Sequence, residues 1–419
     1  MLFFYACSTG FLGGLTWLYS KQDDSPLRRL YWPLLFYKLA AGVCMGLLYT
    51  YYYTEGDTFS FFGDATRLAG LARDNPAEYV RFLWNGGEEH PFWHVIDNRQ
   101  SRSLFMVKGV SMVALVSGNN YWIATLYFSF FSFAGAWYLA KVTISQWRHT
   151  EGAALVAFLI YPSIVFWSSG IVKESLAVPC LFCMVAIFLK LWHRPRIRWV
   201  DWIVLLLCGW ISWRLKYYYT SIFLSVACAS LAVKYMNDIL QIRRVKSRVL
   251  MWMLIFALFT TAATLLHPNF SLQVLPHVIA DNYYAYEKAD GAAIITFDDF
   301  RPTWASMLKH APKALVSGLF RPFLWEADSW IMLGAALENT ILLAFSLWAF
   351  VRRPRVFAVK EPLLILALVA FVVLLGILLP LSTPNFGTLS RYRIGYLAFF
   401  VFVLMLRNPM MRRKDIPLA

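Results

Sequence analysis

The chain has 419 residues, of which 59% are hydrophobic, 18% are aromatic and only 15% are charged. Soluble domains carry about a quarter charged residues and a little under half apolar ones, so a soluble protein with a single core is excluded. The apolar residues form blocks of about 15–24, the length that a helix needs to cross a bilayer about 30 Å thick. The composition therefore predicts a polytopic, all-α membrane protein with a formal net charge of +15.

In chain order, the apolar blocks predict about eleven transmembrane helices, packed as one integral domain over residues 1–419. Two long polar segments, 54–118 and 267–330, interrupt the series. Apolar residues recur at helical spacing in both segments, which predicts amphipathic helices lying on the membrane surface. The predicted spans are 2–19, 32–53, 119–142, 153–169, 174–192, 200–213, 217–233, 249–266, 331–350, 362–380 and 392–406.

The loops between these spans differ in charge from one side of the membrane to the other. The loops on one side carry 22 Lys/Arg and 7 Asp/Glu, whereas those on the other side carry 16 of each. Because cytoplasmic loops are enriched in Lys and Arg, the basic side is predicted to be the cytoplasm. This places the N-terminus outside and the C-terminus inside, with segments 54–118 and 267–330 on the periplasmic face of a bacterial inner membrane. The net positive charge is then explained by the Lys and Arg residues of the cytoplasmic loops, and nucleic-acid binding is not expected.

The first outer segment opens with two carboxylates, Asp57 and Asp64, just beyond a predicted span. A carboxylate in this position can take a proton from an incoming hydroxyl group, so both are candidate general bases. They are seven residues apart, about two helical turns, and one helix would place them on the same face. The alternative is that one of them caps the interfacial helix, because Asp favours helix starts. The cytoplasmic loops contain no phosphate-binding glycine loop, so we expect the chemistry outside.

Basic side chains recur on the same outer face. Lys173 and Glu174 occupy a tight turn between two spans, where they could pair with each other or where Lys173 could bind a lipid phosphate. Arg391 and Arg393 precede the last span on the side where positive charge is disfavoured, which indicates a ligand or acidic partners. Guanidinium groups suit bidentate phosphate binding. Further candidates of the same kind are Arg321, Arg301, Arg214 and Lys216.

Three remaining positions carry groups that could bind a ligand or react. Glu338 lies inside a predicted span, where an unpaired charge is unfavourable by about 2.5–3.5 kcal/mol. It is therefore either a site residue or a hydrogen-bonded packing residue. His90 and His94 follow two glutamates, but Pro91 breaks the helix that would align them on a metal. We therefore predict neither a metal site nor a cofactor.

These stretches resemble the GT-C superfamily, multispanning glycosyltransferases that use polyprenyl-phosphate-linked sugars, and in particular its protein-mannosyltransferase-like bacterial members. The resemblance rests on a Gly-Asp-x-x-x-aromatic run at 56–61, a Pro-Ser…Phe-Trp-Ser-Ser-Gly…Lys-Glu turn within 161–174, and Arg-Tyr-Arg at 391–393. It covers most of the chain in topology but only these short stretches in motif. Two features depart from the family: Asp57 is followed by threonine instead of a second acidic residue, and one extra span precedes the family's first helix.

The resemblance implies transfer of a sugar from a polyprenyl-phosphate-linked donor to a glycan, lipid or protein acceptor, in the synthesis of cell-envelope polysaccharide or glycoconjugates. Asp57 or Asp64 would be the base. The residues that would hold the phosphate are Arg391, Arg393, Lys173 and Arg321. A polysaccharide polymerase or ligase has the same topology and is an alternative. A lipid-linked glycan flippase is another, although the sequence has no internal repeat of the kind common in transporters.

Overall fold

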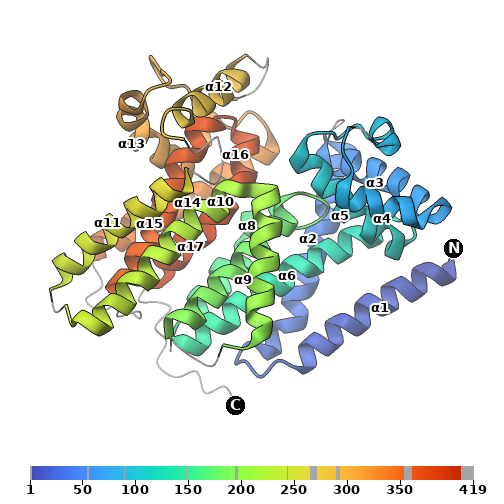
Figure 1. Ribbon diagram of the computed structural model, residues 1–419, viewed down its shortest axis with the longest axis horizontal. Helices are drawn as coiled ribbons and strands as arrows, with labels where there is room; N and C mark the ends of the chain where they lie inside the picture. Colours follow the sequence, from blue (N-terminus) through green and yellow to red (C-terminus); the bar gives the residue numbers. More distant parts are fainter. Residues whose placement is uncertain are drawn as a thin grey trace.

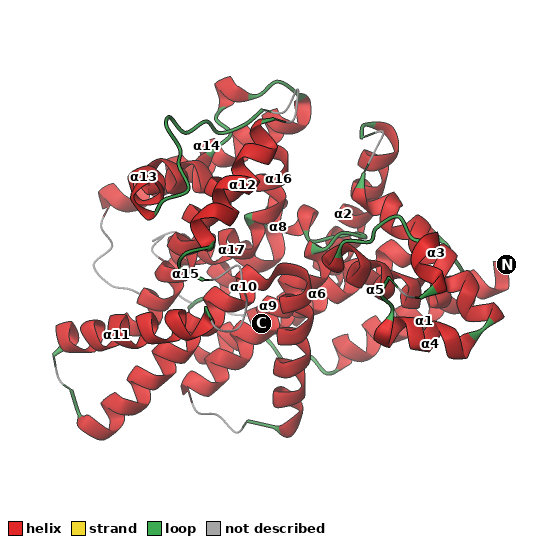
Figure 2. Ribbon diagram, turned by 45° about the horizontal axis from the view of Figure 1, so that its top comes forward, coloured by secondary structure: helices red, strands yellow, loops and turns green. Residues whose placement is uncertain are grey.

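The computed structural model describes residues 2–53, 56–88, 90–147, 149–193, 197–242, 244–264, 271–288, 293–352 and 361–406. Within these ranges the chain folds into helices and contains no β-strand, as Figure 2 shows. The single extended pairing described is an isolated antiparallel bridge between Ile294 and Asn385. The predicted all-α class is therefore confirmed.

Apolar helices from both halves of the chain, most of them long, form the body of the molecule. They are α1 (Leu2–Lys21), α2 (Tyr31–Tyr51), α6 (Tyr121–Gln146), α9 (Glu174–His193), α10 (Trp199–Leu240), α11 (Val245–Ala263), α14 (Trp330–Arg352), α15 (Pro362–Ser382) and α17 (Ile394–Leu406). The remaining helices are α3 (Asp57–Asp74), α4 (Pro76–Asn85), α5 (Ser101–Ser117), α7 (Glu151–Ala154), α8 (Pro162–Trp167), α12 (Leu275–Glu287), α13 (Trp304–Phe320) and α16 (Phe386–Tyr392). A π-helix, Leu155–Ile160, joins α7 to the turn before α8.

Seven of the described helices are long and apolar enough to cross a bilayer, and there are eight if the bent pair α16 and α17 forms one broken span. These helices indicate a membrane protein but do not reach the predicted count of eleven. Four differences explain the gap. Residues 153–169 are interrupted at Tyr161 and are not one helix, and the predicted spans 200–213 and 217–233 belong to the single helix α10. Helix α1 is not among the seven, and α17 counts only together with α16.

Helix α10 is long enough to cross a bilayer twice. Its 42 residues would extend about 63 Å if straight, roughly twice the hydrocarbon thickness. The helix is broken at Lys216, where φ is −143° and ψ is 66°. Figure 1 shows the two arms of α10 descending from a shared apex. Each of the two spans predicted in this region corresponds to one arm.

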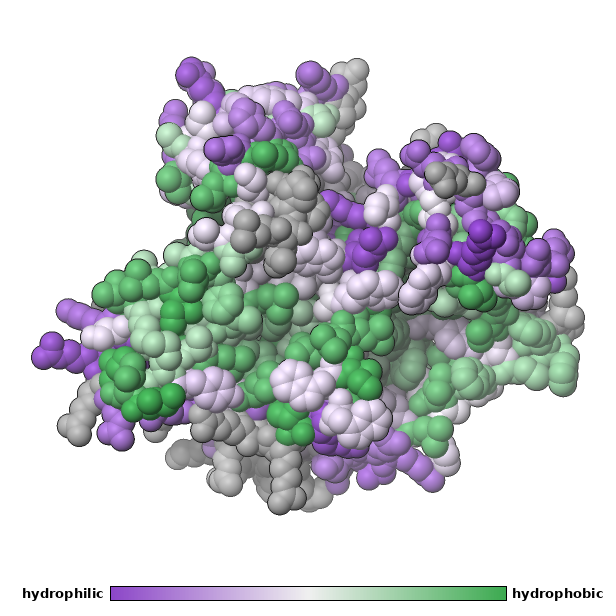
Figure 3. All heavy atoms as spheres, viewed as in Figure 1, coloured by the Kyte–Doolittle hydropathy of each residue, from purple (hydrophilic) through white to green (hydrophobic). Residues whose placement is uncertain are grey.

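Two polar lobes lie at one end of the molecule. Helices α3, α4 and α5 form the first lobe, and α12 and α13 form the second; both stand at the top of Figure 1. Figure 3 shows a band of hydrophobic residues across the middle, with hydrophilic side chains above and below it. An apolar belt between two polar ends is the surface expected of a protein that crosses a bilayer.

The apolar faces of the first lobe are covered by protein. Leu68 of α3 and Tyr79 of α4 are buried in a cluster with residues of α5. The Tyr79 hydroxyl also lies 2.9 Å from Oγ of Ser111 in α5. By contrast, Trp304 and Leu308 of α13 remain exposed. Further along α13, Leu319 is buried and Leu315 packs against the core, so the predicted stripe of the second lobe is exposed only at its start.

A sharp bend between α16 and α17 shapes the interior below the lobes. The axes of the two helices differ by 64°. Tyr219 of α10 holds the bend, because its hydroxyl donates to the carbonyl of Tyr392. A Cβ atom at Gly395 would lie 2.5 Å from the Tyr219 ring, so glycine is needed for this close approach.

Candidate functional site

A polar cavity of about 500 Å³ lies where both lobes meet the long helices. Figure 3 shows hydrophilic side chains gathered in the recess between the lobes. The wall combines the start of α3, the loop before α5, the turn before α9, and parts of α12 and α16. The lining residues are Asp57, Asp97, Asn98, Arg99, Gln100, Ser103, Lys173, Tyr286, Thr388, Arg391 and Tyr392.

Asp57 and Arg391 meet at this wall. Asp57 is the first residue of α3, its side chain is 48% exposed, and its Oδ2 accepts a hydrogen bond of 2.8 Å from Nη2 of Arg391. The residue before the helix is Gly56, which offers no side-chain cap, so neither Asp57 nor Asp64 caps α3. A carboxylate in the first turn is nevertheless favoured by the helix dipole. The fold thus joins the predicted base to a predicted phosphate ligand.

Two further charged side chains, Glu174 and Lys216, lie behind Arg391 in the interior of the protein. Arg391 Nε lies 3.1 Å from Oε2 of Glu174, and Oε1 of Glu174 lies 2.8 Å from Nζ of Lys216. Glu174 is fully buried and the Lys216 side chain is 3% exposed. Because each buried charge has a neighbour of opposite sign, the arrangement avoids the large penalty of an unpaired buried ion. We call Asp57, Arg391, Glu174 and Lys216 the charge chain.

Lys173 reaches the cavity from the tight turn before α9. Gly170 adopts φ +72°, a conformation that side chains with a Cβ rarely take, and its N–H donates to Oγ of Ser129 at 3.1 Å. Lys173 Nζ donates to Oγ of Ser103 at 2.9 Å. Burial, followed by the charge of Lys216, lowers the pKa of Lys173 to about 8. Of the two alternatives for this turn, the pairing of Lys173 with Glu174 is not the one observed, because Glu174 pairs with Lys216 and Arg391.

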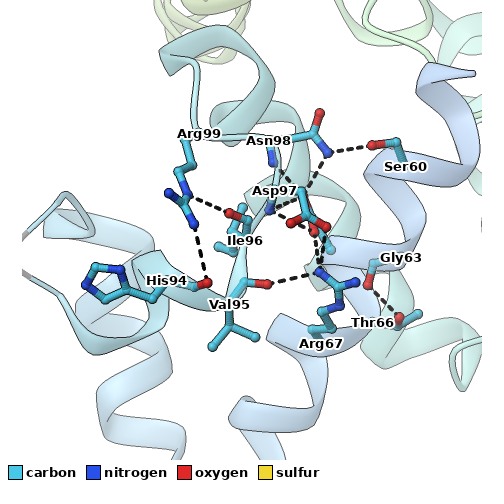
Figure 4. A network of polar contacts seen from close by, with 11 residues as sticks. Ser60, Gly63, Thr66, Arg67, His94, Val95, Ile96, Asp97, Asn98 and Arg99 are labelled. Carbon is cyan, nitrogen blue, oxygen red and sulfur yellow. Dashed lines mark hydrogen bonds and ion pairs between the residues drawn. The ribbon is translucent and has the colours of Figure 1, made fainter.

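Asp64 lies outside the cavity and orders one of its walls. The side chain is 2% exposed and accepts hydrogen bonds from the backbone N–H groups of Asp97 at 3.2 Å and Asn98 at 2.9 Å. Asn98 Nδ2 adds a bond of 2.7 Å, and Arg67 lies 3.1 Å away. Figure 4 shows Arg67, Asp97 and Asn98 converging in this network. With its oxygens occupied in this way, Asp64 holds the loop that carries Arg99 to the cavity.

Arg393 also lies away from the cavity, although only one residue separates it from Arg391. It is fully buried; Nη2 donates to Oδ1 of Asn339 at 2.7 Å and Nη1 to the carbonyl of Arg321 at 3.0 Å. Residues two apart on a helix point in different directions and do not face each other. The two arginines therefore do not share one ligand, and Arg393 ties α17 to α14.

Five other candidates lie outside the cavity. Arg321 pairs with Glu326 in the segment that follows α13, and His90 lies 3.0 Å from Glu78. Arg214 lines a separate groove. Arg301 and His94 are exposed. Among the residues that the structure describes, no group of three or more His, Cys, Asp or Glu side chains could hold a metal ion.

Glu338 lines an apolar groove on the other side of α16. This groove, which we call the α16 groove, has a volume of about 500 Å³ and lies among α2, α8, α14 and α16. Glu338 Oε2 accepts hydrogen bonds from Ser163, at 2.7 Å from Oγ and 3.2 Å from the backbone nitrogen. Phe386 and Ser390 line the groove, whereas Arg391 lines the cavity. The short helix α16 thus lines an apolar space on one side and a polar space on the other.

The sequence reasoning missed several lining residues. All seven residues from 97 to 103 are polar and stand directly before the apolar part of α5. That run was a readable signal, because a dense polar stretch beside an apolar helix indicates a wetted surface. Tyr286 and Thr388 carried no comparable signal, since single residues of these types are common.

The cavity can bind an anion and accept a proton. Arg391 and Lys173 supply positive charge, and Asp57 supplies a half-exposed carboxylate next to them. No family model, curated protein or solved structure matches the chain. The chemistry of this cavity therefore carries the functional assignment.

Proposed function

We propose that the protein is a membrane glycosyltransferase of the outer face of the bacterial inner membrane. It transfers a sugar from a polyprenyl-phosphate-linked donor to a glycan, lipid or protein acceptor. The observation that carries this proposal is the contact between Asp57 and Arg391 at the wall of the polar cavity. A base and a phosphate-binding group side by side suit a displacement at a sugar carbon that bears a phosphate.

In this proposal both lobes face the outside, as does the N-terminus, while the C-terminus is cytoplasmic. Helices α3, α4, α12 and α13 then lie at the outer interface. A count of eleven crossings requires α1, both arms of α10, the broken segment 153–169 and the bent pair α16 and α17 each to cross the membrane. The charge asymmetry of the loops supports this orientation.

The donor phosphate binds at Arg391 and Lys173. In the free protein Arg391 contacts two carboxylates, Asp57 at the cavity and Glu174 behind it. A phosphate entering the cavity replaces Asp57 as the partner of Arg391, while Glu174 keeps the guanidinium in place. Asp57 is thereby released from Arg391, and its oxygens become free to accept the proton of an acceptor hydroxyl. Donor binding and the availability of the base are coupled in this way.

Asp57 then removes the proton from the acceptor hydroxyl, and the oxygen attacks the anomeric carbon. The new carbon–oxygen bond forms as the bond to the phosphate oxygen breaks, and the electron pair leaves with the lipid phosphate. Attack from the side opposite the phosphate inverts the anomeric configuration. The cations neutralise the departing charge, so a general acid is not required.

The α16 groove supports a route for the lipid. A polyprenyl chain needs an apolar surface that is continuous with the bilayer, and the groove lies between long apolar helices. Helix α16 lines both this groove and the cavity that holds Arg391. The lipid chain can therefore stay in apolar surroundings while its phosphate reaches the polar space.

Substitution of three aspartates of α3 tests the base assignment. Asp57→Asn should lower transfer by about 100-fold or more, because general-base catalysis contributes roughly that much, without changing the unfolding temperature. Asp74→Asn, at the exposed end of the same helix, should leave both unchanged. Asp64→Asn should destabilise the protein, because it weakens the network around Asp97 and Asn98. An Asp57→Asn enzyme with full activity would remove the base assignment.

A transporter of lipid-linked glycans is the second candidate. It is favoured by the bent pair α16 and α17, because broken helices are typical of transporter binding sites. Lipid extracts from cells that lack the protein separate the two functions. A transferase leaves its lipid-linked sugar on the outer leaflet, whereas a flippase leaves it on the cytoplasmic leaflet. Accumulation on the cytoplasmic side would contradict the transferase.

A further inference from the structure

A second groove, separate from the cavity and from the α16 groove, runs between the first lobe and the long helices α1, α6 and α10. Its volume is about 950 Å³, and we call it the α1 groove. In Figure 1 this region lies between α1 below and α4 and α5 above. Large apolar side chains stand exposed along it, namely Leu15, Trp84, Met112, Phe131, Leu207 and Trp210.

Two cations lie together in this apolar groove. Lys108 Nζ lies 3.3 Å from the carbonyl of Leu83 and 3.4 Å from that of Gly86, and the Arg214 guanidinium lies 5.5 Å from the centroid of the Phe105 ring. In the described part of the chain neither cation has a carboxylate within 4 Å. Burial, followed by the charge of Arg214, lowers the pKa of Lys108, so the two cations repel each other. An anion placed between them would relieve that repulsion.

The groove changes from charged to apolar along its length. On the first arm of α10 it is lined by Arg214, Ile211 and Leu207, which are spread over about 10 Å of helix. The charged end is next to the break at Lys216, where the charge chain lies. The apolar end continues onto Phe131 of α6. An anionic head with an apolar chain matches this gradient at both ends.

Other ligands match only one end of the α1 groove, either the charged end or the apolar end. A free anion would pair with the cations but would leave the aromatic walls uncovered. A neutral lipid would cover the walls but would leave the two cations without a counter-charge. Basic pockets between membrane helices are a known setting for phosphorylated headgroups, because guanidinium and ammonium groups donate to phosphate oxygens.

We infer that the α1 groove binds a phosphate-bearing membrane lipid, with the phosphate at Lys108 and Arg214 and the chains along Phe131 and Leu207. Arg99 lines both this groove and the polar cavity, so the bound headgroup lies beside the cavity wall. The inference goes beyond the proposed function and concerns binding alone. Its test therefore measures lipid binding and needs no measurement of sugar transfer.

Native mass spectrometry of the full-length protein in neutral detergent tests the inference. Dioleoyl phosphatidate should bind at least tenfold more tightly than dioleoylglycerol, which has the same chains and lacks the phosphate. The double variant Lys108→Gln, Arg214→Gln should lose at least tenfold in affinity for phosphatidate. Arg102→Gln is the matched control, because Arg102 lies on the same helix as Lys108 and does not line the groove. It should bind as the wild type does.

Three results would overturn the inference: equal binding of dioleoylglycerol, unchanged binding by the double variant, or binding of inorganic phosphate as tight as that of phosphatidate. The last result would identify a free-anion site. Lys108 also contacts the carbonyls at the end of α4, so its substitution could disturb the fold. Arg214→Gln alone, at an exposed residue, should therefore be measured as well. It should weaken phosphatidate binding at least threefold at an unchanged unfolding temperature.

Discussion

Glu174 is the buried anion between two cations, and its charge holds the charge chain together. Glu174→Gln would leave Arg391 and Lys216 close to each other without compensation. Removing one partner of a buried ion pair lowers the free energy of unfolding by about 3–5 kcal/mol, and we expect a loss of this size. Thermal unfolding of the purified protein in detergent measures it.

Asp24 offers the control, because its side chain is 96% exposed and lies 3.3 Å from Nζ of Lys141. Asp24→Asn should lower the free energy of unfolding by less than about 1 kcal/mol, as is usual for surface pairs. Similar losses in both variants would mean that the charge chain contributes no more than a surface contact does.

Lys173 makes the proposed donor binding depend on pH. Its pKa of about 8 lies below that of a free lysine, so its positive charge is present below pH 8 and is lost as the pH rises through that value. We expect donor affinity to fall over the same range. Lys173→Arg keeps its charge at these pH values and should abolish this fall, whereas Lys173→Met should bind weakly at every pH. A donor titration at several pH values measures the effect, and an unchanged profile in Lys173→Arg would contradict it.

The same burial has the opposite consequence for stability. The unfolded chain keeps the proton on Lys173 to a higher pH than the folded chain does. Between pH 8 and the ordinary lysine pKa of about 10.4, the unfolded state therefore binds more protons. The contribution of Lys173 to the free energy of unfolding consequently increases as the pH rises through this window.

Some site residues could be predicted from the sequence because membrane topology makes them unusual. Arg391 is a cation on the side where cations are disfavoured, and Asp57 is an acid directly after a span. The sequence could not separate Arg391 from Arg393, because the direction of each side chain depends on the bend between α16 and α17. It could not separate Asp57 from Asp64 either. Asp64 is distinguished by the hydrogen bonds that it accepts from the backbone N–H groups of Asp97 and Asn98, which are distant in sequence.

At the scale of the elements, the turn before α9 depends on the backbone of Gly170. Gly170→Ala should lower the free energy of unfolding by about 1–2 kcal/mol, the cost of a left-handed conformation for a residue with a Cβ. Steric overlap adds little, because the nearest atom to a new Cβ, Met45 Sδ, is 3.5 Å away. Gly63→Ala, in open space within α3, should be neutral or slightly stabilising. Thermal unfolding of both variants measures this difference, and equal effects would contradict the role of the turn.

Helix type was predictable from the apolar blocks, but the limits of the helices were not. Hydropathy records where apolar residues lie and does not show whether a polar residue ends a helix or only bends it. Lys216 stands buried at the break in α10, where its ammonium group pairs with Glu174 and lies over the Tyr392 ring. Both of these partners are distant in sequence. The break was therefore readable as a gap between two spans but not as a bend within one helix.

At the scale of the whole molecule, the orientation in the membrane can be measured by cysteine labelling. In a variant without the native cysteines, Arg81→Cys in the first lobe should react with a membrane-impermeant maleimide added outside the cell. Asp24→Cys, in the loop that joins α1 to α2 at the opposite end, should react only after the membrane is opened. Both positions carry highly exposed side chains, so access to the reagent decides the result. The reverse labelling pattern would show that the first lobe faces the cytoplasm and would contradict the proposed orientation.

The charge chain also constrains the order in which the protein matures. Its four members stand at positions 57, 174, 216 and 391. Arg391 is therefore synthesised last, long after the other three members. Until then Glu174 has only Lys216 as a partner, and the carboxylate at the head of α3 has none. A nascent chain halted before α16 therefore lacks Arg391, and its charge chain is incomplete. Helix α16 thus supplies the residue that joins Asp57 to Glu174.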